Sequence, residues 1–158
     1  MLKCTLICVG RLKTPYWLEA IKTYAQKLRH GLKIEEMTIK DADPALSVAE
    51  RKNQEGERIL AALNGLPPGR LCVALDEHGE SLSSKDLAAL LDKCALNSRQ
   101  PCFIIGGPYG LSEAVLTACQ RKISLSKLTF THELAQVLLW EQLYRADSII
   151  RGTGYHHE

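Results

Sequence analysis

The sequence lacks long hydrophobic runs, paired-cysteine motifs and any large net charge. No apolar stretch approaches the roughly 20 residues needed to cross a bilayer, and residues 1–10 read as a strand instead of a signal peptide. The six cysteines include no C-x-x-C pair, which favours buried free thiols over a disulfide framework or a zinc site. We therefore expect a cytoplasmic protein that has no contact with a membrane.

Two phosphate-binding signatures are also missing. The glycine-rich stretch Gly106–Gly110 lacks the spacing G-x-G-x-x-G of the dinucleotide fingerprint, and the chain has no G-K-[ST] of a P-loop. The stretch follows an apolar run, so it can be either a structural turn or a ligand loop. The histidines His132, His156 and His157 share no ligand spacing with a cysteine or carboxylate cluster, so we predict no metal site.

What the chain does contain is a regular alternation of strand-like and helix-like segments. Its 158 residues suit one domain over residues 1–158. The alternation predicts an α/β fold with a mostly parallel sheet flanked by helices. Strands are expected at 2–9, 32–40, 70–75, 101–105 and 122–125, and helices at 14–28, 43–63, 83–96, after 112, and 131–150.

Capping residues predict where these helices begin. Thr14-Pro15 and Asp43-Pro44 each place an N-cap residue before a proline at the first helical position. Ser83-x-x-Asp86 resembles a capping box, and Ser112 is a candidate N-cap. The segment from Glu77 to Glu80 is expected to be a loop.

The charge is unevenly distributed. Residues 1–33 contain seven Lys or Arg residues and a single acid, which gives this segment a net charge of +6. This segment can face phosphate groups, or it can be a solvated helix surface.

Three features near the C-terminus are open to two interpretations each. The stretch Ser126–Thr131 offers hydroxyls and backbone donors that can wrap a polar small molecule, or it is an ordinary connection. Glu141 and Arg145 lie four residues apart, so they can form a simple surface pair or part of a site. The tail with Tyr155 and His156 is either disordered, as termini usually are, or folded over a site.

Taken in order, several motifs together resemble the RlmH family of SPOUT-class methyltransferases. The motifs are V-G-R-L-K at 9–13, E-G-E-R-I-L at 55–60, I-I-G-G-P-Y-G-L at 104–111, L-S-K-L-T-F-T-H at 125–132, E-Q-L-Y-R-A at 141–146 and Y-H-H at 155–157. The resemblance covers the whole chain. It implies a SPOUT-type fold with a C-terminal trefoil knot, and a homodimer in which each site is completed across the interface.

The resemblance also implies an activity. Members of the family methylate N3 of a pseudouridine in helix 69 of 23S rRNA, within the assembled ribosome, and use S-adenosyl-L-methionine. By position, the residues that would hold this cofactor are Leu75, Gly106, Gly107, Ser126, Lys127, Leu128, Thr129, Phe130 and Thr131. Two departures from the family pattern stand out. Thr131 replaces the usual proline, which is expected to loosen the loop, and Gln136 replaces a frequent arginine.

The chemistry of this reaction selects candidate catalytic residues. N3 of pseudouridine must lose a proton before it can attack a methyl group, and a nearby cation favours the anionic form. Arg145 is the candidate cation, and His156 or Tyr155 can relay the proton, with His132 as a weaker candidate. Two rival interpretations are a nucleotide-dependent enzyme on an unknotted α/β fold and a non-enzymatic ribosome-associated factor.

Overall fold

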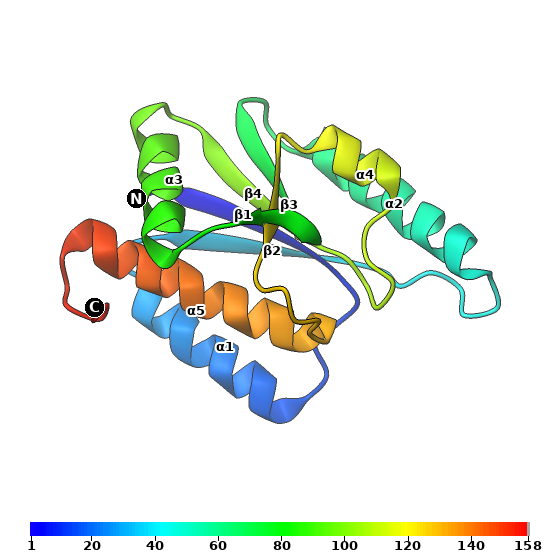
Figure 1. The fold of residues 1–158 in the computed structure, drawn as a ribbon, viewed down its shortest axis with the longest axis horizontal. Helices are drawn as coiled ribbons and strands as arrows, with labels where there is room; N and C mark the ends of the chain where they lie inside the picture. The colour runs from blue at the N-terminus through cyan, green and yellow to red at the C-terminus, as the bar shows by residue number, and fades with distance from the viewer. Residues whose placement is uncertain (158) are drawn as a thin grey trace.

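The computed structural model describes residues 1–157 and shows a central sheet between two groups of helices (Figure 1). The strands are β1 (Lys3–Val9), β2 (Lys33–Ile39), β3 (Arg70–Ser81), β4 (Gln100–Ile105) and β5 (Arg121–Ser124). The helices are α1 (Pro15–Leu28), α2 (Val48–Gly65), α3 (Ser84–Leu96), α4 (Glu113–Ala118) and α5 (His132–Arg151). The predicted alternation of strands and helices is therefore confirmed.

The sheet has the order β2-β1-β4-β3-β5, and every neighbouring pair of strands is parallel. Parallel strands place all their carboxyl ends at one edge of the sheet. In open α/β sheets, ligands bind just beyond these ends. The loops after β3, β4 and β5 therefore lie at the edge where a site is expected.

Each face of the sheet has its own hydrophobic core. Successive strand residues point to opposite faces, so Leu6 of β1 packs in the core with α1, α3 and α5, whereas Ile7 packs in the core with α2 and α4. Figure 1 shows the same division, with α1 beside α5 on one side and α2 beside α4 on the other. Helix α5 is the last element and lies against both α1 and α3.

Most of the predicted helix starts are confirmed by capping geometry. Thr14 precedes α1 and Pro15 is its first residue. Ser83 and Asp86 form the predicted capping box of α3, because the Asp86 N–H donates to Ser83 Oγ at 3.1 Å and the Ser83 N–H donates to Asp86 Oδ2 at 2.9 Å. Ser112 caps α4. Ser83 and Ser112 each cap their helix through the side chain, whereas Thr14 occupies the N-cap position without a side-chain cap.

The predicted start of the second helix at Asp43-Pro44 is wrong. Helix α2 begins at Val48, after a capping box in which Ser47 Oγ accepts from the Glu50 N–H at 3.2 Å and Glu50 Oε2 accepts from the Ser47 N–H at 2.9 Å. The Asp43 carboxylate instead accepts from the Ala45 N–H at 3.0 Å and holds a turn before the helix. Asp43 and Ser47 are both capping residues. The box formed by Ser47 and Glu50 satisfies two backbone N–H groups, whereas Asp43 satisfies one.

The predicted loop at Glu77–Glu80 is also wrong, because this segment continues β3. Ile123 of β5 is the register partner of both Leu75 and Glu80, so β3 bends around β5 between these two residues. Gly79 lies inside the bend, where an added Cβ would stand 2.7 Å from the backbone nitrogen of Ile123. Only glycine permits this approach of two backbones.

All six cysteines are free thiols, and five of them are buried, as the sequence predicted. Burial raises the pKa of the remaining thiol, Cys119, to about 11. Within residues 1–157, no cluster of three His, Cys, Asp or Glu side chains could hold a metal ion. No helix of the described chain is both long and apolar enough to span a bilayer.

Candidate active site

The residues predicted to bind a cofactor lie at the carboxyl edge of the sheet, on strand β3 and in the two loops that follow β4 and β5. Leu75 ends the first straight part of β3, Gly106 and Gly107 follow β4, and Ser126–Thr131 follow β5. These three strands are neighbours in the sheet. Thr129 Oγ1 donates to Glu77 Oε2 at 3.4 Å, which joins the loop after β5 to the bend of β3.

The glycine loop is a tight turn with closely packed backbone. The Gly110 N–H donates to the Gly107 carbonyl at 3.0 Å, and Gly110 has a φ of +82°, which favours glycine. A Cβ at Gly106 would stand 2.8 Å from the carbonyl carbon of Gly110. Of the two interpretations left open by the sequence, the structural turn is therefore shown, and its residues 108–110 are exposed at the carboxyl edge of the sheet.

The loop after β5 combines internal support with unused polar groups. Ser124 Oγ donates to the Ser126 carbonyl at 2.8 Å, and the Leu128 N–H donates to Ser126 Oγ at 3.0 Å. Across residues 1–157, no hydrogen bond uses the N–H of Thr129 or Phe130. The Leu128 side chain is 72% exposed. An exposed apolar side chain beside unused backbone donors suits a ligand with both apolar and polar parts.

Thr131 joins this loop to α5 as its N-cap. Its Oγ1 accepts from the Leu134 N–H at 3.3 Å, and its φ of −60° is close to the angle that proline imposes. The proline-like backbone angle and the side-chain cap both support this end of the loop, and the expectation that Thr131 loosens the loop stays a prediction. His132 is the first residue of α5 and lies at this same end.

The predicted catalytic residues form a second cluster, at the other end of α5. Glu141 Oε1 accepts from Arg145 Nη2 at 2.5 Å and from Arg145 Nε at 3.0 Å. The same oxygen accepts from the Tyr155 hydroxyl at 3.3 Å. Arg145 Nη1 lies 3.5 Å from His156 Nδ1. The tail is thus folded back against α5, and the Glu141–Arg145 pair is part of a network instead of an isolated surface pair.

Charges within this cluster set the protonation of its members. The Glu141 carboxylate accepts hydrogen bonds from Arg145 and raises the pKa of its guanidinium, so this group stays cationic. Burial raises the pKa of the Tyr155 hydroxyl, and the charge of Glu141 adds to the effect. Tyr155 therefore remains protonated at neutral pH and acts as a donor.

Sequence reasoning missed the aromatic surroundings of this cluster. The Tyr155 ring lies 4.5 Å from the Tyr144 ring, which in turn lies 6.1 Å from Tyr24 of α1. Lys27 Nζ lies between 5.2 and 5.8 Å from the centroids of all three rings. Tyr24 and Lys27 are three residues apart in α1, a spacing that places them on one helix face, but only the packing of α1 on α5 brings them to the tail.

The two clusters do not meet within one chain. Thr131 and Arg145 are separated by 14 residues of helix, or about 20 Å at 1.5 Å per residue. Figure 1 shows the loop after β5 at one end of α5 and the C-terminus at the other. The structure therefore groups the predicted cofactor residues together and the predicted catalytic residues together, but keeps the groups apart.

Comparison with known proteins identifies the family. A family model described as "Predicted SPOUT methyltransferase" matches residues 2–156. Proteins named "Ribosomal RNA large subunit methyltransferase H" are similar over almost their whole length. The protein from Oleidesulfovibrio alaskensis is 48% identical over 153 residues, covering 96% of this chain and 97% of the relative. The chain belongs to the RlmH family of SPOUT methyltransferases.

A second relative agrees with this assignment. The protein of the same name from Nitratidesulfovibrio vulgaris strain DP4 is 42% identical over 154 residues, covering 97% of each chain. The family resemblance inferred from the ordered motifs is thus confirmed, as is the SPOUT-type α/β fold with a parallel sheet. Four of the six RlmH motifs fall on the two clusters described above, with 104–111 and 125–132 at the carboxyl edge of the sheet and 141–146 and 155–157 at the tail.

Proposed function

We propose that this chain methylates N3 of a pseudouridine in helix 69 of 23S rRNA, with S-adenosyl-L-methionine as the methyl donor. The observation that carries this proposal is the full-length similarity to relatives named as large-subunit rRNA methyltransferases. The position of the RlmH motifs at the ligand-binding edge and at the tail supports it. The assembled ribosome in the cytoplasm would be the substrate, because a chain with a net charge of +2 has little general attraction for free RNA.

The three loops at the sheet edge fit such a cofactor. Gly106 and Gly107 would shape the loop that borders it, because a Cβ at Gly106 would meet the Gly110 backbone and a Cβ at Gly107 would meet the Glu55 carboxylate. Leu75 and the exposed Leu128 would contact its adenine. The backbone of the remaining loop residues would bind its polar edges, namely Ser126, Lys127, Thr129, Phe130 and Thr131. When bound, the cofactor supplies a methyl group on a sulfonium, which is transferred by in-line displacement.

The tail cluster would activate the acceptor nitrogen. Arg145, held cationic by Glu141, favours the deprotonated form of the pseudouridine imide. His156 lies beside Arg145 and would accept the proton. Tyr155 is the weaker relay, because its pKa is raised and its hydroxyl donates to Glu141. Its role would be to hold the tail in position.

A homodimer would bring the two clusters together. Because about 20 Å of helix separates them in one chain, the tail of one protomer would complete the cofactor edge of its partner. A two-fold symmetric dimer would form two such sites. The C-terminal trefoil knot that the family implies is part of this proposal.

The direct test is methyl transfer from labelled S-adenosyl-L-methionine. Whole ribosomes and free 23S rRNA, both from a strain that lacks the modification, would be compared as acceptors. We expect label on ribosomes, mapped to a pseudouridine in helix 69, and little label on free RNA. Cofactor binding with label elsewhere would overturn the assigned acceptor. No cofactor binding by calorimetry would favour a non-enzymatic ribosome-associated factor, and binding of a nucleotide instead would favour the unknotted-fold enzyme.

A mixed-dimer experiment tests the shared site. Arg145→Ala and Gly106→Ala each damage one of the two clusters, so dimers of either variant alone should have little activity when the cofactor concentration is well below the wild-type dissociation constant. Equimolar mixing after subunit exchange should restore about a quarter of the wild-type activity, because half of the dimers then contain one intact composite site. If each chain forms its own site, mixing will restore nothing.

A further inference from the structure

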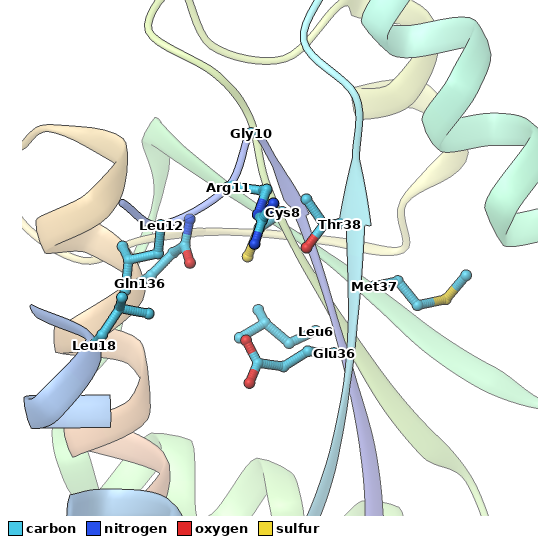
Figure 2. Close-up of a pocket in the computed structure, with 10 residues that line it drawn as sticks. All are labelled: Leu6, Cys8, Gly10, Arg11, Leu12, Leu18, Glu36, Met37, Thr38 and Gln136. Atoms are coloured by element: carbon cyan, nitrogen blue, oxygen red, sulfur yellow. The ribbon is translucent and has the colours of Figure 1, made fainter. Parts of the chain in front are cut away.

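A pocket away from both clusters lies between β1, β2, α1 and α5 (Figure 2). Its volume is about 200 Å³. Part of its wall is aliphatic, formed by Leu6, Leu12 and Leu18. Its polar lining includes Arg11, Glu36, Thr38 and Gln136. Neither the cofactor loops nor the tail contributes to it.

Gln136 presents an unsatisfied donor to this pocket. The residue is 3% exposed, and its Nε2 is buried without a hydrogen-bond partner among the residues described. Figure 2 shows the amide directed from α5 into the pocket. A buried donor without a partner costs about 1–3 kcal/mol. An acceptor on a bound molecule would remove this cost.

Glu36 presents unused acceptors from the opposite side. Figure 2 shows its carboxylate directed from β2 into the same space. Within residues 1–157, no hydrogen bond or ion pair involves this carboxylate. Its neighbour Glu35 points to the other face of the strand and pairs with Lys33 at 3.1 Å. Glu36 is exposed on the edge strand β2, so the pocket places a buried donor amide opposite an exposed carboxylate whose oxygens accept no hydrogen bond from the residues described.

This arrangement selects a planar ligand with two adjacent donors and a nearby carbonyl. Guanine has this edge, because its N1–H and N2 amino group can donate to one carboxylate while O6 accepts from an amide. Uracil offers a single ring donor between two carbonyls, and adenine and cytosine place an acceptor nitrogen beside their amino group. Single-stranded RNA is commonly recognised through such unstacked base edges. The aliphatic wall would contact the face of the base.

We propose that the pocket binds an unstacked guanine of the RNA substrate, with Glu36 and Gln136 reading its edge. Gln136 lies five residues after Thr131, which is about 8 Å along α5 from the cofactor loop. A nucleotide near the modified one could therefore reach it. Arg11 lines the pocket within the segment 1–33, whose net charge of +6 would attract the adjoining phosphates. The inference rests on the proposed function for its RNA substrate.

The test is binding of single nucleotides to the whole chain, observed by NMR at the side-chain amide of Gln136. The probes are GMP, AMP, CMP and UMP. The Gln136→Met variant assigns the resonance by its disappearance. We expect GMP to shift this resonance in a saturable way and the other three nucleotides to bind at least about fivefold more weakly, the lower end of the discrimination that a bidentate base contact provides.

Two carboxylate variants sharpen the test. Glu36→Gln should abolish the preference for GMP, whereas Glu35→Gln, one residue along β2, should leave it unchanged. Equal responses of the unaltered chain to all four nucleotides, or a preference for GMP that survives Glu36→Gln, would overturn the proposal. So would a response to arginine amide with none to GMP, which would indicate a protein side chain as the occupant.

This outcome is separable from that of the proposed function. GMP binding without cofactor binding or methyl transfer would support the pocket and contradict the enzyme. Methyl transfer to ribosomes without any GMP response at Gln136 would support the enzyme and contradict the pocket. Dispersed amide spectra of each variant would show that the chain remains folded in every case.

Discussion

The two ends of α5 are built in different ways. At its start, loops from three strands expose backbone groups and the apolar Leu128 side chain. At its end, side chains satisfy one another, with Glu141 accepting from both Arg145 and Tyr155. The unpaired backbone groups at the start of α5 suit a ligand that carries polar groups. The second end holds a charge in place.

In the proposed site, the two halves lie on one helix but do not meet within one chain. Backbone donors at a sheet edge suit a cofactor, because they are rigid and independent of side-chain charge. Acceptor activation would require a fixed cation, and Glu141 fixes the Arg145 guanidinium. Because about 20 Å separates the two ends, the proposed site needs a second protomer, and each end can be tested separately.

The largest effect is expected from Arg145→Ala. Loss of the cation should lower methyl transfer to ribosomes by at least about a hundredfold, a typical cost for removing one group that stabilises developing charge. The dissociation constant for the cofactor should change by less than about twofold, because Arg145 lies far from the loops. Arg151→Ala is the matched control, since Arg151 also pairs with an acid four residues earlier, Asp147. An equal loss in both variants would contradict a specific role.

A smaller effect is expected at the other end of α5 from Gly106→Ala. The added Cβ would meet the Gly110 backbone at 2.8 Å, so the glycine loop must open. We expect the cofactor to bind about tenfold more weakly by calorimetry, which corresponds to 1.4 kcal/mol. Gly65→Ala, at a position with nothing within 4 Å of the new Cβ, should leave the affinity unchanged. Unaltered binding in Gly106→Ala would exclude this loop from the cofactor site.

Thr131→Ala should reduce the stability of the fold and not the rate of methyl transfer. Removal of Oγ1 leaves the Leu134 N–H without its cap and should lower the free energy of unfolding by about 1 kcal/mol in urea titrations. Thr129→Ala removes a hydroxyl whose one hydrogen bond is long, at 3.4 Å, and should cost less than about 0.5 kcal/mol. If both variants lose the same stability, the cap is not what anchors this end.

The smallest effect is a pH dependence at the first turn of α5. Glu133 Oε2 accepts from the Thr14 hydroxyl at 2.5 Å and Oε1 from the Lys13 N–H at 3.1 Å, and these bonds lower the pKa of its carboxyl. Because the folded protein holds the pKa of Glu133 below its ordinary value, the ionised carboxylate stabilises the fold at any pH above that ordinary value. This stabilisation is lost as the pH falls through the pKa of the folded state. Between about pH 5 and pH 3, wild-type stability should therefore fall more steeply than that of Glu133→Gln.

Local signals in the sequence predicted much of the fold. The N-caps at Thr14, Ser83 and Ser112 lie at the positions that the sequence predicted, because a cap depends on residues within one helical turn. The start of α2 was misplaced because Asp43 and Ser47 both carry capping chemistry, and only the box formed by Ser47 and Glu50 starts the helix. The candidate site residues came from ordered motifs, whose grouping into two clusters could not be seen in the sequence.

The sequence by itself determined the alternation of strands and helices, the family and most helix starts, since these depend on short-range patterns. Only the tertiary structure decided the bend of β3 around β5, because the approach of Gly79 to Ile123 joins residues far apart in the chain. The same holds for the pocket at Gln136 and for the tail folded on α5. Each arises where separate elements pack against one another, and no local pattern encodes that contact.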